Sequence, residues 1–340
     1  MLPRERIYAV LEGKTPDYVP SFPKISFATS QWIPQMSVID YMSDAQAMAD
    51  ALLTSAQRFH YDGIGVTVGI CNEGMALGSQ YEALTNALPK LTRYLLTDVS
   101  QWQAVPCPDP HTTEPLHTIL QAISLLRQSN SGLFLTAWCN GPLNIASQLL
   151  PLEDLLCGML EDPESTHALL QQCTNFACQC AKAMIAAGAD GISIGHATAS
   201  CTVISPAFYQ EFALPYEKQI VNAIHQAGGV AITHICGNIM PIAPYISQNG
   251  SELIDCDHMC NLIGVLQNTG KVIRGNLDPA LLAGGTSKEV YEVAKQLLLE
   301  AKHTKRFLLG SGCEVNLGTP AENMEALARA RHDYGSYNME

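Results

Sequence analysis

Short hydrophobic runs alternate along the chain with longer segments in which hydrophobic residues recur at helical spacing. The short runs predict strands at 18–22, 62–68, 133–137, 190–194, 230–234, 253–256, 272–275 and 306–309. The helical spacing predicts helices at 4–12, 44–59, 163–187, 206–227, 287–302 and 320–333. Strands that alternate with helices are typical of a parallel sheet covered by helices.

Two of the predicted helices have clear end signals. Gly188 follows the helix at 163–187, and glycine favours the left-handed conformation that stops a helix. Ser205 and Pro206 open the helix at 206–227, where serine suits the N-cap and proline the first turn. These signals support the predicted helix positions.

Eight strands alternating with helices fit either a barrel or a doubly wound sheet. The strand count favours the barrel, and no G-x-G-x-x-G follows the first strand to favour a dinucleotide fold. We therefore predict the α/β class, as a single (β/α)₈ TIM barrel with an N-terminal helical extension, in one domain over 1–340. The long segment 69–132 is expected to hold a hairpin and extra loops near the barrel mouth.

Composition narrows the range of partners. Hydrophobic residues make up 47% of the chain but aromatics only 7%, which suits the aliphatic core of a buried parallel sheet. Charged residues are only 15%, so we expect part of the surface to lie in the interface of a homo-oligomer. The formal net charge of −13 disfavours nucleic acid and anionic membrane surfaces as partners.

The cysteines indicate a reducing compartment. The chain has 12 of them without the regular spacing of a disulfide framework. The N-terminal stretch is charged and lacks the apolar core of a signal peptide, and no apolar run reaches the length of a membrane span. We expect a cytoplasmic protein with reduced thiols.

Three residues at predicted strand ends form a candidate metal site. His234 ends the fifth strand and Cys236 follows two positions later, so in an extended chain both point to the same side. Cys313 follows the eighth strand, and closure of a barrel can bring it to the same face. One imidazole and two thiolates suit zinc, and three protein ligands leave one position open for a substrate thiol.

A purely structural role is also open to each of these residues. Cysteine is often simply buried, and a histidine at a strand end is often only hydrogen-bonded. A rival cluster, Cys256-Asp257-His258-Met259-Cys260, has a spacing that fits no common zinc pattern cleanly.

Several motifs follow one another along the chain, namely R-E-R-I-Y-A-V-L-E-G-K-T-P-D-Y-V-P (4–20), T-A-S-C-T-V-I-S-P (198–206), F-A-L-P-Y (212–216), T-H-I-C-G-N (233–238), G-N-L-D-P (275–279) and G-C-E-V-N-L-G-T-P-A-E-N (312–323). In sequence and order they resemble motifs of the uroporphyrinogen decarboxylase superfamily, in particular its methylcobalamin:coenzyme M methyltransferase branch. The resemblance spans nearly the whole chain. It implies that His234, Cys236 and Cys313 match the H-x-C…C zinc signature of the branch.

The decarboxylase branch is a poorer match. Its members hold a carboxylate-rich tetrapyrrole with arginines near the first strand and with an aspartate in an F-S-D-I-L motif. Here the first segment has Lys24 and no arginine, and Gly69 stands where the aspartate is expected. Porphyrinogen decarboxylation is therefore disfavoured, although it stays the main competing activity.

The resemblance also suggests residues that line the pocket. Relatives often have Asp-Pro after the fourth strand where this chain has His196-Ala197, which is either a neutral change or an altered acceptor pocket. Asp255 and Asp257 end the sixth strand and are candidates for the open metal position or for supporting its ligands, but solvated or capping roles fit them equally well. Glu73 matches an acidic family position, as a helix cap or a functional group, and Asn276 ends a strand in a matching motif.

The expected reaction is transfer of a methyl group from a methylated corrinoid to a thiol bound on Zn²⁺, such as coenzyme M. The D-x-H-x-x-G motif of corrinoid-binding domains is missing, because D-P-H-T-T-E (109–114) lacks the glycine. The methylcorrinoid is thus expected free or on a separate corrinoid protein. Methyl transfer to tetrahydrofolate is a competing reaction, and a non-catalytic zinc or corrinoid-binding role also competes with it.

Overall fold

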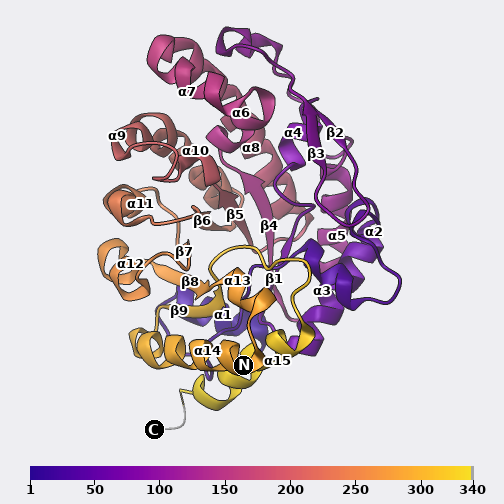
Figure 1. Cartoon of the computed structure of the whole chain (residues 1–340), viewed down its shortest axis with the longest axis vertical. Helices are drawn as coiled ribbons and strands as arrows, with labels where there is room; N and C mark the ends of the chain where they lie inside the picture. The colour runs from indigo at the N-terminus through magenta and orange to yellow at the C-terminus, as the bar shows by residue number, and fades with distance from the viewer. Residues whose placement is uncertain (338–340) are drawn as a thin grey trace.

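The computed structural model describes residues 1–337, so the last three residues of the predicted domain lie outside it. Within that range a seven-stranded sheet is parallel throughout, in the order β1-β4-β5-β6-β7-β8-β9 (Figure 1). The strands are β1 (Gly63–Val66), β4 (Phe134–Asn140), β5 (Gly191–Gly195), β6 (Val230–His234), β7 (Leu253–Cys256), β8 (Val272–Leu277) and β9 (Phe307–Ser311). The sheet curls and is surrounded by helices, which confirms the TIM-barrel-like class.

Helices fill the connections between the strands. The larger ones are α1 (Pro3–Leu11), α3 (Ala45–Phe59), α5 (Leu116–Gln128), α6 (Pro142–Leu149), α7 (Leu152–Glu161), α8 (Pro163–Ala187), α10 (Leu214–Gln226), α12 (Leu262–Thr269), α14 (Ser287–Ala301) and α15 (Ala321–Tyr334). Shorter ones are α2 (Val38–Ser43), α4 (Asn72–Ala76), α9 (Pro206–Phe208), α11 (Ala243–Ile246) and α13 (Pro279–Gly284). Gly188 ends α8 with a φ of +120°, as its sequence position predicts.

The predicted strand at 18–22 is wrong as a strand. Ser21 forms an isolated parallel bridge with Leu309 of β9. The N–H of Phe22 donates to the Leu309 carbonyl, and the Ser21 carbonyl accepts from the N–H of Asp62, just before β1. Pro20 and Pro23 have no N–H to donate, so the ladder cannot extend. This short segment therefore joins the two edges of the sheet in place of an eighth strand.

The segment between β1 and β4 holds the predicted hairpin. Its strands are β2 (Gln80–Glu82) and β3 (Lys90–Arg93), which pair antiparallel. The same segment also contains three elements that were not predicted, namely α4, a 3₁₀ turn at Val99–Ala104 and the helix α5, although buried residues of α5 recur at helical spacing. The β-then-α order is therefore kept across this long connection.

The predicted helix at 206–227 is interrupted. A π-helical turn, η4 (Tyr209–Ala213), separates α9 from α10. Pro215 lies at the start of α10 and lacks the N–H that would continue regular bonding to the preceding turn, which explains the break.

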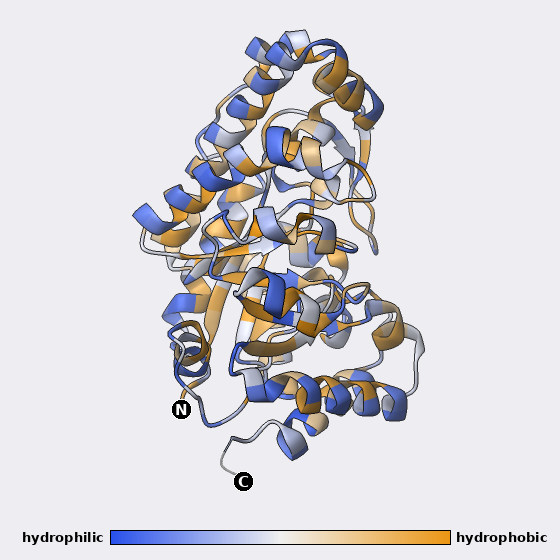
Figure 2. Cartoon of the chain, turned by 90° about the vertical axis from the view of Figure 1, so that its left-hand side faces the viewer, coloured by the Kyte–Doolittle hydropathy of each residue, from blue (hydrophilic) through white to orange (hydrophobic). Residues whose placement is uncertain are grey.

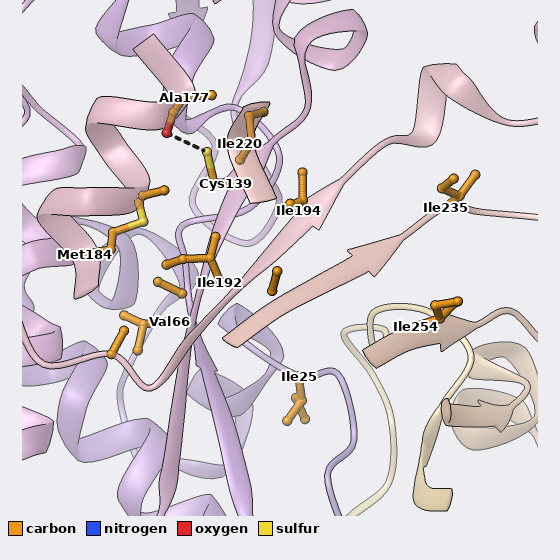
Figure 3. Packing of buried hydrophobic residues seen from close by; sticks show 14 of the residues in the cluster. Ile25, Val66, Cys139, Ala177, Met184, Ile192, Ile194, Ile220, Ile235 and Ile254 are labelled. Atoms are coloured by element: carbon orange, nitrogen blue, oxygen red, sulfur yellow. Dashed lines mark hydrogen bonds between the residues drawn. The ribbon is translucent and has the colours of Figure 1, made fainter. Parts of the chain in front are cut away.

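The core has two parts. In the larger one, Ile192 and Ile194 of β5 pack with residues of the surrounding helices, and the thiol of Cys139 donates to the Ala177 carbonyl of α8 at 3.6 Å (Figure 3). In the smaller one, Ile7 and Val10 of α1 pack against the first residues of several strands, so the predicted N-terminal helix covers one end of the barrel. Hydrophilic and hydrophobic residues recur along the outer helices, as expected for helices with one buried face (Figure 2). Within residues 1–337, every helix is too short or too polar to cross a lipid bilayer.

Candidate metal centre

The three sequence-predicted ligands meet where β6 and β9 end. Nε2 of His234 lies 3.4 Å from Sγ of Cys236 and 3.7 Å from Sγ of Cys313. The three ligand atoms all lie within 4.8 Å of one another. Among residues 1–337 this is the one group of three or more His, Cys, Asp or Glu side chains close enough to share a metal ion. Closure of the sheet therefore brings Cys313 to the pair on β6.

The loops that carry the thiols are held by neighbouring segments. The hydroxyl of Ser200 donates to the Cys236 carbonyl at 2.7 Å, and the N–H of Gly237 donates to Asp257 at 2.9 Å. Before Cys313, a Cβ on Gly312 would lie only 2.4 Å from the backbone nitrogen of His258. Glycine is thus required there for the two loops to approach each other.

A buried ion pair orients His234. Nδ1 of His234 lies 3.4 Å from Oδ2 of Asp255, an electrostatic contact rather than a well-directed hydrogen bond. Arg274 on β8 donates to both oxygens of Asp255, from Nε and Nη2, at 2.7 Å each. The carboxylate faces the ring nitrogen that points away from the thiols, as in the carboxylate–histidine pairs that fix metal-bound imidazoles.

The pKa values of the two thiols shift in opposite directions, so that Cys313 is the one that ionises first. The hydrogen bond from Cys236 lowers the pKa of Cys313 far below its ordinary value, and the nearby His234 and Lys24 lower it further. The same hydrogen bond, together with burial, raises the pKa of Cys236. One thiolate is therefore stabilised even without an ion, and thiolates are the form that binds metals.

A cavity of about 240 Å³ opens beside the three ligands. Its wall includes Lys24, Trp138 and Glu314, together with Leu88 from the loop between β2 and β3. The ammonium of Lys24 lies 3.9 Å from the centre of the Trp138 ring. Glu314 accepts hydrogen bonds from the N–H and hydroxyl of Ser26 at 2.7 and 2.5 Å, and burial raises its pKa to about 7.

Glu73 and His196 do not belong to the group of three converging side chains, although the backbone N–H of His196 donates to the His234 carbonyl at 2.8 Å. The carboxylate of Glu73 is buried and accepts from the backbone N–H and the side-chain amide of Asn140, at 3.0 and 2.5 Å. Nε2 of His196 lies 3.6 Å from Glu217 on α10, and burial lowers the pKa of the imidazole. The next residue, Ala197, is the one that faces the cavity.

Asp257 and Asn276 stabilise the loops around the ligands. Besides Gly237, Asp257 accepts from the N–H of Met259 at 3.0 Å. The side-chain amide of Asn276 donates to the carbonyls of Asp257 and Cys260 at 3.2 and 3.1 Å. Asp255, Asp257 and Asn276 thus surround the centre through its supporting contacts, and their functional roles stay predictions.

The rival cluster at 256–260 does not bring three potential metal ligands together. Cys256 and Cys260 are buried, and the Cys260 thiol donates to the Gly237 carbonyl at 3.3 Å, while His258 is partly exposed and faces Asp257 and Asp278. Sequence reasoning instead missed Trp138 and Glu314 and treated Lys24 only as a departure from the decarboxylases. Only Glu314 carried a signal, because it lies next to Cys313 in the motif at 312–323.

Comparison with known proteins places the chain in a family. The family profile described as uroporphyrinogen decarboxylase (URO-D) matches residues 2–334. A methylcobamide:CoM methyltransferase of Methanosarcina acetivorans is 27% identical over 98% of this chain and 98% of its own length. A uroporphyrinogen decarboxylase of Carboxydothermus hydrogenoformans is 25% identical over 79% of this chain and 77% of its own.

The solved structure of a methyltransferase from Methanosarcina mazei has a TM-score of 0.89 with this chain at 21% identity, and covers 98% of this chain and 99% of its own. It shares the fold. The resemblance to the methyltransferase branch, drawn from the motifs, is confirmed by the sequence relatives named methylcobamide:CoM methyltransferases. Because the family profile extends over nearly all of its residues, the chain belongs to the uroporphyrinogen decarboxylase family.

Proposed function

We propose that the protein is a zinc-dependent methyltransferase that moves a methyl group from a methylated corrinoid to a thiol such as coenzyme M. The observation that carries the proposal is the convergence of His234, Cys236 and Cys313, with ligand atoms within 4.8 Å of one another, beside a cavity. The similarity to methylcobamide:CoM methyltransferases over the full chain supports the same reaction.

The donor set fits zinc. With Zn–S of about 2.3 Å and Zn–N of about 2.0–2.1 Å, a tetrahedral ion holds neighbouring N and S ligands about 3.5 Å apart. The distances from His234 Nε2 to the two sulfurs, 3.4 and 3.7 Å, lie close to that spacing. A bound zinc ion with three protein ligands would supply a Lewis acid that keeps a substrate thiol ionised near neutral pH.

The chain's own residues then have separate tasks. His234, Cys236 and Cys313 hold the ion, and Asp255 fixes the orientation of the His234 ring. The cavity receives the thiol and restricts the space around its sulfur. No side chain is needed as a general acid, since the thiol would lose its proton to solvent on binding and its sulfur would attack the methyl carbon. The bond between the methyl group and the corrinoid cobalt would break, with its electron pair left on the corrinoid.

The corrinoid is proposed to approach the open end of the barrel from a separate protein or free in solution. A cytoplasmic location is part of the proposal, because the reaction needs reduced thiols.

A decarboxylase role is less well supported. At Gly69 the φ of +108° is a backbone conformation that side chains rarely adopt, and a Cβ there would meet Cδ2 of Leu88 at 2.6 Å, so the aspartate expected in the decarboxylases would be strained and would displace the Leu88 side chain. The cavity of about 240 Å³ is also below the usual size of sites for larger ligands, about 300–1,000 Å³. A tetrapyrrole would require a much larger opening.

The test combines metal analysis with turnover. We expect about one zinc per wild-type chain, because the three side chains form one site. Cys313→Ala removes one ligand, and should weaken zinc retention and abolish demethylation of methylcobalamin. Coenzyme M, homocysteine and tetrahydrofolate are offered in parallel as acceptors. Stoichiometric zinc without turnover with any acceptor would favour a non-catalytic zinc protein. Coproporphyrinogen formation without metal would favour the decarboxylase.

A further inference from the structure

Lys24 places a cation in the wall of the cavity, and among residues 1–337 it forms no ion pair with a carboxylate. It is half-buried, and its ammonium lies over the Trp138 ring at 3.9 Å from the centre. A half-buried ammonium that no carboxylate neutralises, and that lies beside a cavity, is placed to bind an anionic group of a ligand.

Glu314, the carboxyl group in the same wall, does not serve as that counter-ion. Its Oε1 accepts two hydrogen bonds from Ser26, and within residues 1–337 it forms no ion pair with Lys24. The ammonium is close enough for its charge to contribute a lowering of the pKa at Cys313, His234 and Glu314. Lys24 and the three metal ligands therefore face the same small space.

The size of that space limits its occupant. About 240 Å³ admits a molecule of a few heavy atoms but not a pteridine with its side chain. A thiol whose sulfur lies at the metal ligands must place its other end within this cavity. An unpaired ammonium in the wall would bind a sulfonate or carboxylate there through charge-assisted hydrogen bonds.

We propose that Lys24 is the residue that selects the acceptor, by binding the acid group of a short anionic thiol whose sulfur lies at His234, Cys236 and Cys313. The inference rests on the proposed methyl transfer and adds a recognition residue to it. The positive charge of Lys24 would make the enzyme prefer an alkane thiol with an acid group over a neutral or cationic thiol of the same length.

The test compares three two-carbon thiols as acceptors for methylcobalamin with the zinc-loaded protein. We expect 2-mercaptoethanesulfonate to show a KM about 10- to 100-fold below those of 2-mercaptoethanol and cysteamine, the range of one charged hydrogen bond. Lys24→Gln should raise the KM for the sulfonate to the level of the neutral thiol. The loss with the sulfonate should exceed any loss with 2-mercaptoethanol by at least about tenfold, because the neutral thiol has no charge for Lys24 to bind.

Two variants control for charge and folding. Lys24→Arg keeps the cation and should keep the preference for the sulfonate. Lys90→Gln removes an exposed lysine of the hairpin, and should leave the preference unchanged because its charge lies in solvent. Similar KM values for all three thiols with the wild type, or an equal loss with all three in Lys24→Gln, would overturn the role of Lys24.

A binding measurement separates this inference from the proposed function. Ethanesulfonate has no thiol, so calorimetry with metal-free protein tests the acid subsite alone. We expect binding to wild type and to Lys24→Arg, and at least roughly a tenfold loss in Lys24→Gln. If wild type turns over no thiol but binds ethanesulfonate through Lys24, methyl transfer fails and the anion site stands. If wild type turns over thiols without preference and does not bind ethanesulfonate, only the role of Lys24 fails.

Discussion

At the scale of single residues, the centre depends on buried charges that lie on neighbouring strands. Asp255 of β7 and Arg274 of β8 are both almost fully buried and pair through two hydrogen bonds of 2.7 Å. Burial raises the pKa of Asp255, but Arg274 and His234 outweigh it and hold that pKa below its ordinary value. The carboxylate is therefore charged at neutral pH and faces the imidazole.

Asp255→Asn should weaken both the fold and the metal centre. It leaves Arg274 buried without a counter-ion, which costs about 3–5 kcal/mol of unfolding free energy. It also removes the charge that faces His234, and loss of such a partner typically lowers metal affinity about 10- to 100-fold. Urea unfolding and zinc competition with a chelator measure the two effects.

Arg274→Met is the matched control. It also leaves a buried charge unpaired and should destabilise the fold by a similar amount. Because it keeps Asp255 beside His234, its zinc affinity should fall less. Equal losses of zinc affinity in the two variants would mean that the centre responds only to stability, and would contradict an orienting role for Asp255.

At the scale of elements, one glycine lets two strands build the cavity wall. Asn140 of β4 pairs with Gly195 of β5. A Cβ on Gly195 would lie 1.9 Å from Cζ2 of Trp138, so the indole lies directly against the β5 backbone. The same indole contacts the ammonium of Lys24. The missing side chain at Gly195 thus leaves room for the indole ring over which the ammonium lies.

Gly195→Ala should therefore displace Trp138. Overpacking of this kind costs about 1–3 kcal/mol of unfolding free energy, and the indole can no longer support Lys24. Gly284→Ala is the control, because a Cβ there meets no atom within 4 Å and the residue lies in α13. We expect no loss of stability in the control. Chemical denaturation measures the free energy of unfolding of both variants. Equal stability of the two variants would contradict the tight packing of Trp138 on β5.

The strands were the most predictable elements because they are fully buried. β6 at 230–234 and β7 at 253–256 have the predicted bounds, since continuous hydrophobic runs are confined to the interior. The segment at 18–22 has a similar hydrophobic pattern, but Pro20 and Pro23 limit it to a bridge. The break before Pro215 was likewise encoded by a proline that hydropathy alone does not weigh.

The three candidate ligands were predictable from sequence because their placement depends only on strand direction and on spacing along the chain. His234 and Cys236 are two residues apart, and Cys313 follows a strand, so strand direction alone places all three at one end of the barrel. Lys24 and Trp138 carry no such signal. Lys24 follows the segment at 18–22, which bonds to both edges of the sheet, and only the closed structure brings it to Trp138.

At the scale of the whole molecule, charged side chains tie distant parts of the chain together at the end of the barrel that α1 covers. Arg6 of α1 pairs with Asp17 at 2.6 Å and also with Asp62, just before β1. Arg331 of α15 pairs with Asp62 at 2.7 Å. The first and last helices are thus joined through residues next to the first strand, at the end opposite the candidate metal centre.

This network should make the free energy of unfolding depend on pH in the acidic range. The hydrogen bond from Arg6 holds the pKa of Asp17 well below its ordinary value of about 3.9. A carboxylate with a lowered pKa in the fold stabilises it above the unfolded-state pKa, and that contribution is lost as pH falls toward the folded-state value. Asp17→Asn should therefore be less stable than wild type at about pH 6, with the difference shrinking from about pH 4 downward. Urea unfolding of metal-free protein measures this, with the exposed Asp50→Asn as control. A difference between wild type and Asp17→Asn that stays constant down to about pH 2 would show that packing, rather than the ion pair with Arg6, holds α1 on the barrel.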